Sequence, residues 1–313
     1  MSPSVGVVIP TRGHRPEHLR AATRAALDQD HPGAVEVVIV VDGPDTAVVT
    51  DQVAGLLASR ARTLGEERAA GRGVRVVTNR FGSGLPGARN TGIAALGTDL
   101  VAFCDDDDQW LPGKIDAQVA ALRETPGAEF SSCAIEVEYG TRRVPRLAGT
   151  SVITRAHLLR SRMVMVHSST FLFRRGAFRV DESAPGGQNE DWDLALRAAA
   201  RRPIVHVDRP LVRVRWGGSL YTTRWADRIA GLEWMLARHP DLAVDSRGAA
   251  RVYGQLAFHH AALGRRREAG RWAWRAFAAR RGEPRAPIAL AVAAGLVSPL
   301  TVLSTLHHRG HGI

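Results

Sequence analysis

The chain has 313 residues, of which 45% are hydrophobic and 23% charged, and its formal net charge at pH 7 is +11. This composition excludes a disordered or fibrous protein, and the length allows one large domain with an appendage, or two domains. The only two cysteines, Cys104 and Cys133, exclude a disulfide framework and lack the spacing of a zinc site, so a reducing, cytoplasmic compartment is expected.

The charge is unevenly distributed along the chain. Residues 1–120 contain 12 basic and 15 acidic residues, a net charge of −3, whereas residues 121–313 contain 30 and 16, a net charge of +14. Nearly all basic residues are arginine, and together with the many alanines this is typical of a GC-rich genome. We therefore do not take the charge as evidence of nucleic-acid binding. The N-terminus lacks the basic segment and the cleavage site of a signal peptide.

The first 105 residues alternate between apolar runs of strand length and amphipathic helical patterns. VGVVIP at residues 5–10 is β-branched and uninterrupted, which is typical of a strand buried on both faces of a parallel sheet. The pattern predicts strands over residues 5–10, 35–43, 74–79 and 100–105, and helices over 16–28, 46–64 and 87–96. With right-handed crossovers, this order predicts an open, doubly wound, mainly parallel α/β sheet whose ligand crevice lies at the carboxyl ends of the strands.

Polar residues stand at the end of each predicted strand. In chain order they are Pro10-Thr11-Arg12, Asp42, Asn79 before a glycine-rich loop, and the run Asp105-Asp106-Asp107-Asp108. Because the carboxyl ends of parallel strands meet at one edge of the sheet, the sequence predicts that these groups share one crevice.

From about residue 130 the strand-like pieces suit mixed or antiparallel additions to the sheet, and the chain then becomes helical. The predicted strands cover residues 129–139, 164–175 and 203–216; the predicted helices cover 191–201, 225–238, 247–262 and 266–281, the last two forming a hairpin joined at Gly264. We therefore divide the chain into residues 1–219, with a nucleotide-binding half (1–120) and an acceptor half (121–219), and a basic helical extension (220–313).

Residues 286–306 carry no charge over 21 residues and follow Arg280, Arg281 and Arg285. The length permits a membrane span, but the many alanines, small polar residues and Pro299 make the segment only moderately apolar. Three interpretations remain open: contact with an anionic membrane surface, a buried packing helix, and a true span.

Four successive aspartates after a buried strand repel one another unless a cation offsets their charge. Mg²⁺ or Mn²⁺ does so through carboxylates and substrate phosphates, so the run predicts a divalent-cation site. An EF-hand is excluded, because Trp110 replaces the required glycine and Asp116 the required glutamate. The alternative is a solvated acidic turn that caps the next helix.

Two further segments have both a functional and a structural interpretation. The glycine-rich segment 82–90 suits backbone contact with a phosphate, although it matches neither a dinucleotide-binding fingerprint nor a P-loop. Glu190 and Asp191 stand at a predicted helix start, where a carboxylate is either a cap or a catalytic base. The adjacent Trp192 favours a partly desolvated pocket.

Five motifs, VVIPTR, VVDGPD, GLPGARNTG, FCDDDDQWLPGK and NEDWDLALR, occur in order over about residues 5–216. In order and spacing this set resembles the family 2 inverting glycosyltransferases of GT-A fold. The resemblance implies Asp191 as general base, Asp105 and Asp107 as the metal-binding DxD pair with Asp106 assisting, and Thr11 and Asp42 near the nucleotide base. With four aspartates in a row, the register of that pair is ambiguous by one residue.

The remaining expected site residues follow from their places in these motifs, except Asn79, which ends the third predicted strand, and His167, which is a separate candidate in the predicted strand 164–175. For the nucleotide sugar they are Pro10, Arg12, Asn79, Gly87, Arg89 and Asn90; for the acceptor, or for support of the site, they are Glu190, Trp192, Trp110 and His167. For His167, a satisfied core histidine is the alternative interpretation. Many relatives carry a histidine after the last strand where this chain reads Val214-Arg215-Trp216-Gly217, so Arg213 or Arg215 is the alternative source of that contact.

The expected function is metal-dependent transfer of a sugar, with inversion, from a nucleotide-diphosphate donor (UDP, dTDP or GDP) to an acceptor hydroxyl. The acceptor is a carbohydrate, a lipid-linked or a small molecule, as in cell-envelope polysaccharide synthesis, and the protein is cytoplasmic or peripheral at the inner face of the membrane. Two alternatives remain: a sugar-1-phosphate nucleotidyltransferase, whose glycine-rich signature after the first strand is missing, and a non-catalytic sugar-nucleotide-binding or membrane-associated scaffold.

Overall fold

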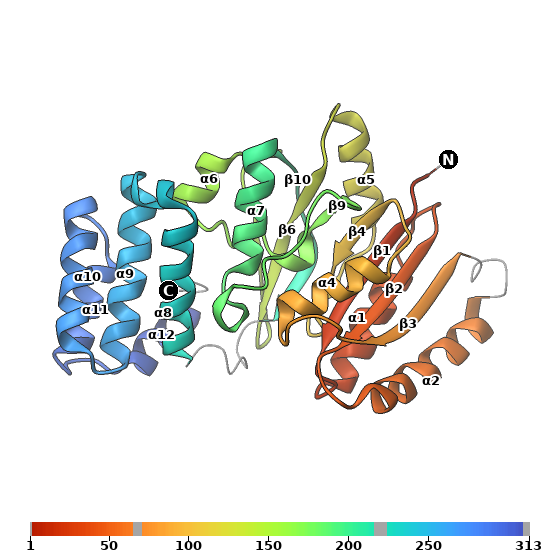
Figure 1. The fold of residues 1–313 in the computed structure, drawn as a ribbon, viewed down its shortest axis with the longest axis horizontal. Helices are drawn as coiled ribbons and strands as arrows, with labels where there is room; N and C mark the ends of the chain where they lie inside the picture. The colour runs from red at the N-terminus through yellow and green to blue at the C-terminus, as the bar shows by residue number, and fades with distance from the viewer. Residues whose placement is uncertain (1, 65–70, 216–223, 309–313) are drawn as a thin grey trace.

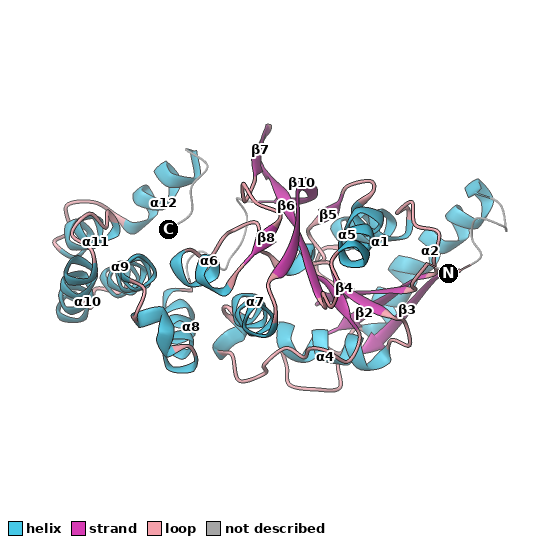
Figure 2. Ribbon diagram, turned by 90° about the horizontal axis from the view of Figure 1, so that it is seen from above, coloured by secondary structure: helices cyan, strands magenta, loops and turns pink. Residues whose placement is uncertain are grey.

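The computed structural model describes residues 2–64, 71–215 and 224–308. Within them, one ten-stranded sheet crosses the molecule, helices cover both of its faces, and a group of helices extends from one end (Figures 1 and 2). The strands are β1 (Val5–Thr11), β2 (Val35–Val41), β3 (Arg72–Thr78), β4 (Leu100–Phe103), β5 (Gln109–Trp110), β6 (Phe130–Tyr139), β7 (Arg142–Arg146), β8 (Val152–Ile153), β9 (Leu172–Arg174) and β10 (Ile204–Arg215).

The helices alternate with the strands in the first half of the chain and stand alone at the end. The α-helices are α1 (Pro16–Leu27), α2 (Thr46–Leu64), α4 (Leu85–Ala95), α5 (Lys114–Glu124), α6 (Arg155–Arg160), α7 (Glu190–Arg201), α8 (Trp225–Arg238), α9 (Ser246–Ala262), α10 (Arg266–Ala279), α11 (Arg285–Ala293) and α12 (Pro299–His308). Short 3-10 helices are η1 (Ser168–Thr170), η2 (Pro185–Gly187) and η4 (Pro240–Ala243).

Strands β3, β2, β1 and β4 lie side by side in that order and are all parallel. Val5 of β1 pairs with Val35 of β2 and Leu100 of β4, and Val35 pairs with Arg72 of β3. All four strands and all three helices predicted for this half are confirmed, with ends shifted by a few residues. The strand predicted over 100–105 stops at Phe103, which leaves the aspartate run in a loop at the sheet edge.

The central strand β1 separates two apolar cores, because successive side chains of a strand point to opposite faces. Val7 and Ile9 pack with α1 and α5, whereas Val8 packs with α4 and α7. Helix α4 approaches β1 closely at Gly92, where an added Cβ would lie 2.2 Å from Cγ1 of Val8. This close contact fixes the position of α4 and of the side chains it presents at the sheet edge.

The second half of the sheet is mixed, as predicted. Strand β9 is antiparallel to both β4 and β6, β10 is parallel to β6 and antiparallel to β5, and the strands predicted over 129–139 and 203–216 are confirmed as β6 and β10. The strand predicted over 164–175 is wrong for most of its length, since only β9 is extended and paired. The reason is local: His167 Nδ1 accepts from the Ser169 amide, and Thr170 Oγ1 donates to the His167 carbonyl, which closes η1.

The C-terminal helices have a small core of their own, built largely from alanines of α9, α10 and α11. The predicted hairpin of α9 and α10 is confirmed, with Gly264 at a left-handed φ of +72° in its turn. The uncharged segment 286–306 is divided into α11 and α12 at Gly295 and Pro299, so it does not form the one long helix that a true membrane span requires. No helix among the described residues is long and apolar enough to cross a membrane. The predicted domain boundary at residue 219 lies outside the described residues.

Candidate functional site

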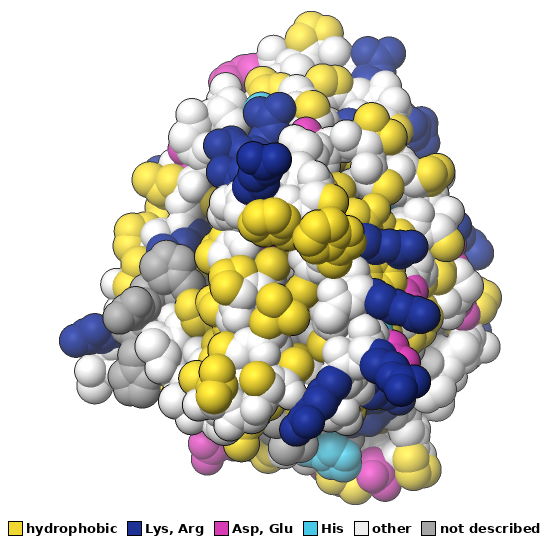
Figure 3. All heavy atoms as spheres, turned by 90° about the vertical axis from the view of Figure 1, so that its left-hand side faces the viewer, with side chains coloured by type: hydrophobic (Ala, Val, Ile, Leu, Met, Phe, Trp, Pro, Cys, Tyr) yellow, Lys and Arg dark blue, Asp and Glu magenta, His cyan; other side chains and the backbone are white. Residues whose placement is uncertain are grey.

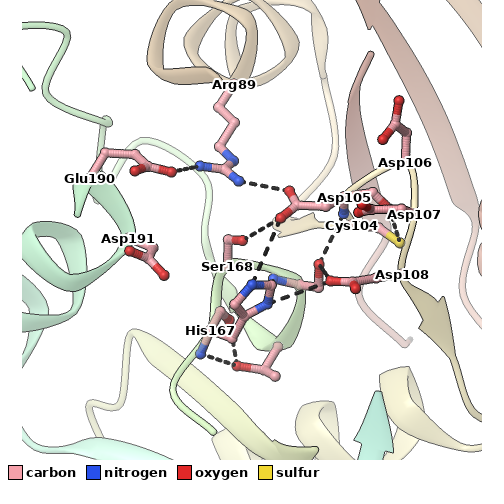
Figure 4. Close-up of polar contacts among 12 residues, drawn as sticks. Arg89, Cys104, Asp105, Asp106, Asp107, Asp108, His167, Ser168, Glu190 and Asp191 are labelled. Atoms are coloured by element: carbon pink, nitrogen blue, oxygen red, sulfur yellow. Dashed lines mark hydrogen bonds and ion pairs between the residues drawn. The ribbon is translucent and has the colours of Figure 1, made fainter. Parts of the chain in front are cut away.

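The predicted crevice is occupied by side chains from the ends of β1, β2 and β4 and from the starts of α4, η1 and α7. Figure 4 shows the part around the aspartate run, where Arg89, His167, Ser168, Glu190 and Asp191 face Asp105 and Asp108. Segments as far apart in sequence as Thr11 and Glu190 therefore share one edge of the sheet. Their contacts form four parts. The first is Asp105 and Asp108 with His167, and the second is the pair Asp106 and Asp107. The third is the loop around Asp42, and the fourth is Asp191.

Arg89 joins the two acidic segments of the site. Its guanidinium is 1% exposed; Nη2 donates to Asp105 Oδ1 at 2.7 Å, and Nη1 donates to Glu190 Oε1. Burial by itself would lower the pKa of Arg89, but Asp105 and Glu190 raise it, so the guanidinium stays charged. Burial also raises the pKa of Glu190 to about 7, although Arg89 opposes that rise. Arg89 thus holds the aspartate run against the start of α7.

Asp105, Asp108 and His167 place one potential ligand atom each within 4.8 Å of one another. His167 Nε2 lies 3.9 Å from Asp105 Oδ2, and Nδ1 lies 3.6 Å from Asp108 Oδ2. Ser168 Oγ donates to Asp105 at 2.9 Å, and Ser169 Oγ donates to Asp108 at 2.6 Å. The two carboxylates are ligands that Mn²⁺ and Mg²⁺ prefer, whereas the imidazole is a ligand of transition metals and not of the hard Mg²⁺.

The protonation of the two aspartates also fits a cation at this place. Burial and then the neighbouring Asp105 and Asp107 raise the pKa of Asp108 well above its usual value. Burial opposes ionisation of Asp105 as well, but Arg89 and His167 outweigh it and lower the pKa of Asp105. A divalent cation relieves the repulsion that raises the pKa of Asp108.

Asp106 and Asp107 turn toward the end of β1 instead. Thr11 Oγ1 donates to Asp106 Oδ2 at 2.6 Å, and Arg15 Nη1 donates to Asp107 Oδ2 and lies 3.7 Å from Asp106 Oδ1. Burial raises the pKa of Asp106 to about 6 despite the hydrogen bond from Thr11. The structure therefore groups Asp105 with Asp108 around His167, whereas the predicted metal pair was Asp105 with Asp107. A metal role for Asp107 stays a prediction, and it requires Arg15 to give up its bond.

Asp42 organises the loop side of the crevice. Its carboxylate accepts from Asn79 Nδ2 at 2.9 Å and from the Gly84 amide at 2.9 Å, and Arg12 Nη2 lies 3.7 Å away. Gly87 is required for this loop, because an added Cβ there would lie 1.8 Å from the Gly82 carbonyl oxygen. Asp42 is thus already bonded by its own chain, so contact with a nucleotide base stays a prediction.

Some predicted site residues point away from the crevice or lie in the core. Pro10 is buried inside β1, and Asn90 Nδ2 donates to Val180 O at 2.9 Å and to Glu182 Oε1 at 2.7 Å. The indoles of Trp110 and Trp192 are 2% and 1% exposed and donate to the carbonyl oxygens of Ser169 and Leu158. Their positions fit support of the site and leave no indole surface free for an acceptor.

Asp191 lies at the start of α7, after Asn189, whose φ of +64° turns the chain into the helix. Arg162 Nη2 lies 3.0 Å from Oδ1 and 3.1 Å from Oδ2 of this carboxylate. Burial would raise the pKa of Asp191, but Arg162 and His167 outweigh it and lower that pKa, so the group stays ionised. Figure 4 shows the Asp191 carboxylate on the side of the site that faces Ser168 and His167.

Four polar residues of the site were not predicted: Arg15, Arg162, Ser168 and Ser169. The two serines follow His167 directly, so the polar run His167–Thr170 inside an apolar stretch was a usable signal. Arg15 and Arg162 are two of many arginines, and nothing in their local sequence distinguishes them. Arg213, suggested above as a substitute for a missing histidine, bonds Glu136 at 2.8 Å within the sheet. Residues 216–219 of that motif lie outside the described residues.

Comparison with solved structures defines the class of fold. The crystal structure of S. aureus TarS 1–349 matches with a TM-score of 0.56 at 13% sequence identity, covering 94% of this chain and 91% of that one. The mannosyltransferase PcManGT from Pyrobaculum calidifontis, in complex with GDP-Man and Mn²⁺, matches with a TM-score of 0.51 at 17% identity, covering 97% and 79%. The fold is thus that of GT-A glycosyltransferases, as the sequence predicted.

Residues 6–180 match the family described as Glycosyl transferase family 2, which covers more than half of the chain. The protein belongs to glycosyltransferase family 2. A curated relative, the Escherichia coli UDP-Glc:alpha-D-GlcNAc-diphosphoundecaprenol beta-1,3-glucosyltransferase WfgD, is 33% identical over 49 residues. That alignment spans 16% of this chain and 19% of the relative.

Proposed function

We propose that the protein transfers a sugar from a nucleotide-diphosphate donor to an acceptor hydroxyl, with inversion at the anomeric carbon. One observation carries the proposal: Asp191, a buried carboxylate bonded by Arg162, directly follows Glu190, and Arg89 joins Glu190 to Asp105 of the Asp105, Asp108 and His167 group. Arg89 and Glu190 hold the two parts together. A base and a cation site on opposite sides of one crevice are what an in-line displacement of a diphosphate requires.

In the proposed reaction, Asp191 takes the proton of the acceptor hydroxyl as its oxygen attacks the anomeric carbon of the donor. The new glycosidic bond forms while the bond between that carbon and the diphosphate oxygen breaks, and the electron pair leaves with the nucleoside diphosphate. Asp105, Asp108 and His167 would hold a divalent cation, which would stabilise the charge on the leaving diphosphate. Arg89 keeps Asp105 ionised for that role.

The donor side is proposed to lie between the end of β1 and the loop around Asp42. Thr11, Arg12, Asn79 and the Gly82–Gly87 loop border this region, and a glycine-rich loop at a helix start suits a phosphate. TarS has been solved with UDP-GlcNAc and PcManGT with GDP-Man, which supports a nucleotide sugar as donor and leaves UDP, dTDP and GDP as candidates.

The acceptor side is proposed to lie next to Asp191 and His167. The short match to an enzyme named for a diphosphoundecaprenol acceptor supports a lipid-linked saccharide, with a free carbohydrate or a small molecule as alternatives. We propose a cytoplasmic protein that acts at the inner face of the membrane.

A thermal-shift panel tests the donor site and its metal. UDP, GDP, dTDP and CDP are each added with and without Mn²⁺ to the wild type, to Asp107→Ala and His167→Ala, and to Asp116→Ala, a control at an exposed position of α5. Stabilisation grows as RT ln(1 + [L]/Kd), so weak binding is visible at millimolar nucleotide. We expect one nucleotide to stabilise the wild type and the control only with Mn²⁺.

The variants His167→Ala and Asp107→Ala distinguish which residues of the aspartate run bind the metal. Loss of the Mn²⁺-dependent shift in His167→Ala alone favours the Asp105, Asp108 and His167 group, whereas loss in Asp107→Ala alone favours the Asp105 and Asp107 pair. No shift with any nucleotide contradicts the donor site and favours a scaffold. Release of pyrophosphate from a nucleoside triphosphate in the presence of a sugar 1-phosphate would instead identify a nucleotidyltransferase.

A further inference from the structure

The C-terminal helices expose large apolar side chains that no other described residue covers. Trp274 is 70% exposed, Leu296 78% and Leu300 61%, and Phe277 and Leu290 are 43% and 49% exposed. We call these five residues the apolar patch; they come from α10, α11 and the segment leading into α12. The rings of Trp274 and Phe277 stack with centroids 6.2 Å apart.

Folding of these helices does not need the apolar patch. The buried side of α10 consists of Ala269, Ala273 and Ala276, which face the core shared with α9 and α11. Trp274 and Phe277 lie on another side of the same helix. An exposed aromatic pair costs solubility, so its presence on a helix with a separate core indicates a surface that is covered by something else.

The apolar patch lies among arginines. Residues 265–285 contain eight arginines and two glutamates, a net charge of +6, and one of the glutamates, Glu283, is buried and bonded to Arg285. Along α10, Arg267, Arg271, Trp274 and Phe277 are spaced at helical repeats, which puts them along one side of the helix. Figure 3 looks onto this end of the molecule and shows hydrophobic side chains gathered in the middle with Lys and Arg side chains around them.

The positive charge around the apolar patch indicates what covers it. A second copy of this chain would bring another net charge of +6 against the first, which opposes association through this face. An anionic surface is attracted instead, and tryptophan with arginine beside it is the combination that lies at the boundary between headgroups and acyl chains. Basic residues near such a surface each add to binding, and their contribution falls with salt.

We propose that the face formed by α10, α11 and the start of α12 docks on an anionic phospholipid bilayer. Trp274, Phe277 and Leu296 enter the headgroup boundary, and the arginines, among them Arg267 and Arg271, contact lipid phosphates. Docking of this kind would hold the protein at the surface where a lipid-linked acceptor is presented. The proposal itself needs neither donor nor acceptor, so it stands or fails independently of the proposed sugar transfer.

Flotation of the full-length protein with vesicles tests the docking. Vesicles of phosphatidylcholine alone are compared with vesicles that contain about 30% phosphatidylglycerol, at low salt and at about 0.5 M NaCl. We expect the wild type to float with the anionic vesicles at low salt, and to remain with the soluble fraction for phosphatidylcholine alone and at high salt.

Two pairs of variants separate the apolar and the charged contributions. Trp274→Ser/Phe277→Ser and Arg267→Gln/Arg271→Gln should each weaken binding by about tenfold or more. The matched controls are Leu147→Ser/Val152→Ser, which removes exposed apolar side chains elsewhere, and Arg24→Gln/Arg142→Gln, which removes exposed arginines elsewhere. Both controls should float like the wild type, and thermal melts establish that every variant is folded.

Three outcomes overturn the proposal. In the first, the wild type does not float with anionic vesicles. In the second, the site variants float as well as their controls. In the third, the wild type is a dimer in lipid-free solution by light scattering and Trp274→Ser/Phe277→Ser makes it monomeric, which assigns the face to a second copy.

Discussion

Arg162 bonds both carboxylate oxygens of Asp191, with Nη2 at 3.0 Å from Oδ1 and 3.1 Å from Oδ2. The two residues come from different elements: Arg162 follows α6, and Asp191 begins α7. Because the arginine lowers the pKa of a carboxyl that burial would otherwise keep protonated, Asp191 is available as a base near neutral pH. The arginine is a positioning residue in the proposed mechanism.

Replacement of Arg162 by Met should raise the pKa of Asp191. An arginine partner lowers an aspartate pKa by about 1–3 units, so the acid limb of the pH profile of kcat should move to higher pH by about that amount. Nucleotide release from the donor identified by the thermal-shift panel measures this profile. Arg160→Met, which removes a half-exposed neighbour 3.6 Å from Asp245, should leave the acid limb in place. An unchanged profile in Arg162→Met would contradict the assignment of Asp191 as base.

Replacement of Arg89 by Met should destabilise the protein strongly. The change leaves Asp105 and Glu190 buried without their common partner, and removal of one partner of a buried ion pair costs about 3–5 kcal/mol. Denaturant unfolding monitored by tryptophan fluorescence measures the loss. Arg143→Met, which removes an exposed pair with Glu138 at 3.6 Å, should cost less than about 1 kcal/mol.

A triple variant distinguishes lost charge balance from lost packing. Arg89→Met combined with Asp105→Asn and Glu190→Gln removes the unpaired charges, and it should recover a large part of the stability. If the triple variant is no more stable than Arg89→Met alone, the cost lies in the packing of the arginine stem.

Gly92→Ala should destabilise the protein by about 1–3 kcal/mol or more, because the new Cβ would lie 2.2 Å from Val8 Cγ1 and push α4 away from β1. Gly55→Ala is the matched control: it is also a helical glycine, with nothing within 4 Å of the added Cβ, and it should stabilise by about 0.5–1 kcal/mol. Thermal melts compare the two. Equal effects would mean that α4 does not depend on this close approach.

Asp193 should make stability depend on pH in the acid range. Burial would raise its pKa, but bonds from His239, Arg197 and Arg238 lower it to about 2. The unfolded chain binds its proton near pH 3.8, so this contribution is complete above that pH and is lost as pH falls toward 2. The shift corresponds to about 2 kcal/mol at 1.36 kcal/mol per unit.

The Asp193→Asn variant measures that contribution. Urea unfolding at each pH gives its free energy of unfolding. This free energy should fall furthest below that of the wild type near pH 6, and the difference should shrink below pH 4. Asp30→Asn, at an exposed position, is the control and should follow the wild type throughout. A deficit that is the same at every pH would contradict the lowered pKa.

The sequence alone determined the order of elements in the first half, because that information is local. Buried parallel strands such as residues 5–10 are uninterrupted runs without a charged residue, and helices such as Pro16–Leu27 repeat apolar residues with a period of 3.6 residues. The position of the acidic run at the sheet edge followed from the same strand pattern, because the run comes directly after a predicted strand. The failed strand over 164–175 shows the limit of the rule, since side-chain bonds at His167 and Thr170 close a turn inside an apolar stretch.

Only the tertiary structure decided how the charges of the site are paired. The run Asp105–Asp108 divides into two groups because Arg89 and His167 approach it from one side and Thr11 and Arg15 from the other. The motif around Arg89 marked it as a site residue without its partners, and no local pattern distinguishes Arg15 from the other arginines of the chain. Their pairing depends on distances between elements that become neighbours only when the sheet and its helices pack, so the charge and the pKa of each carboxyl are properties of the fold.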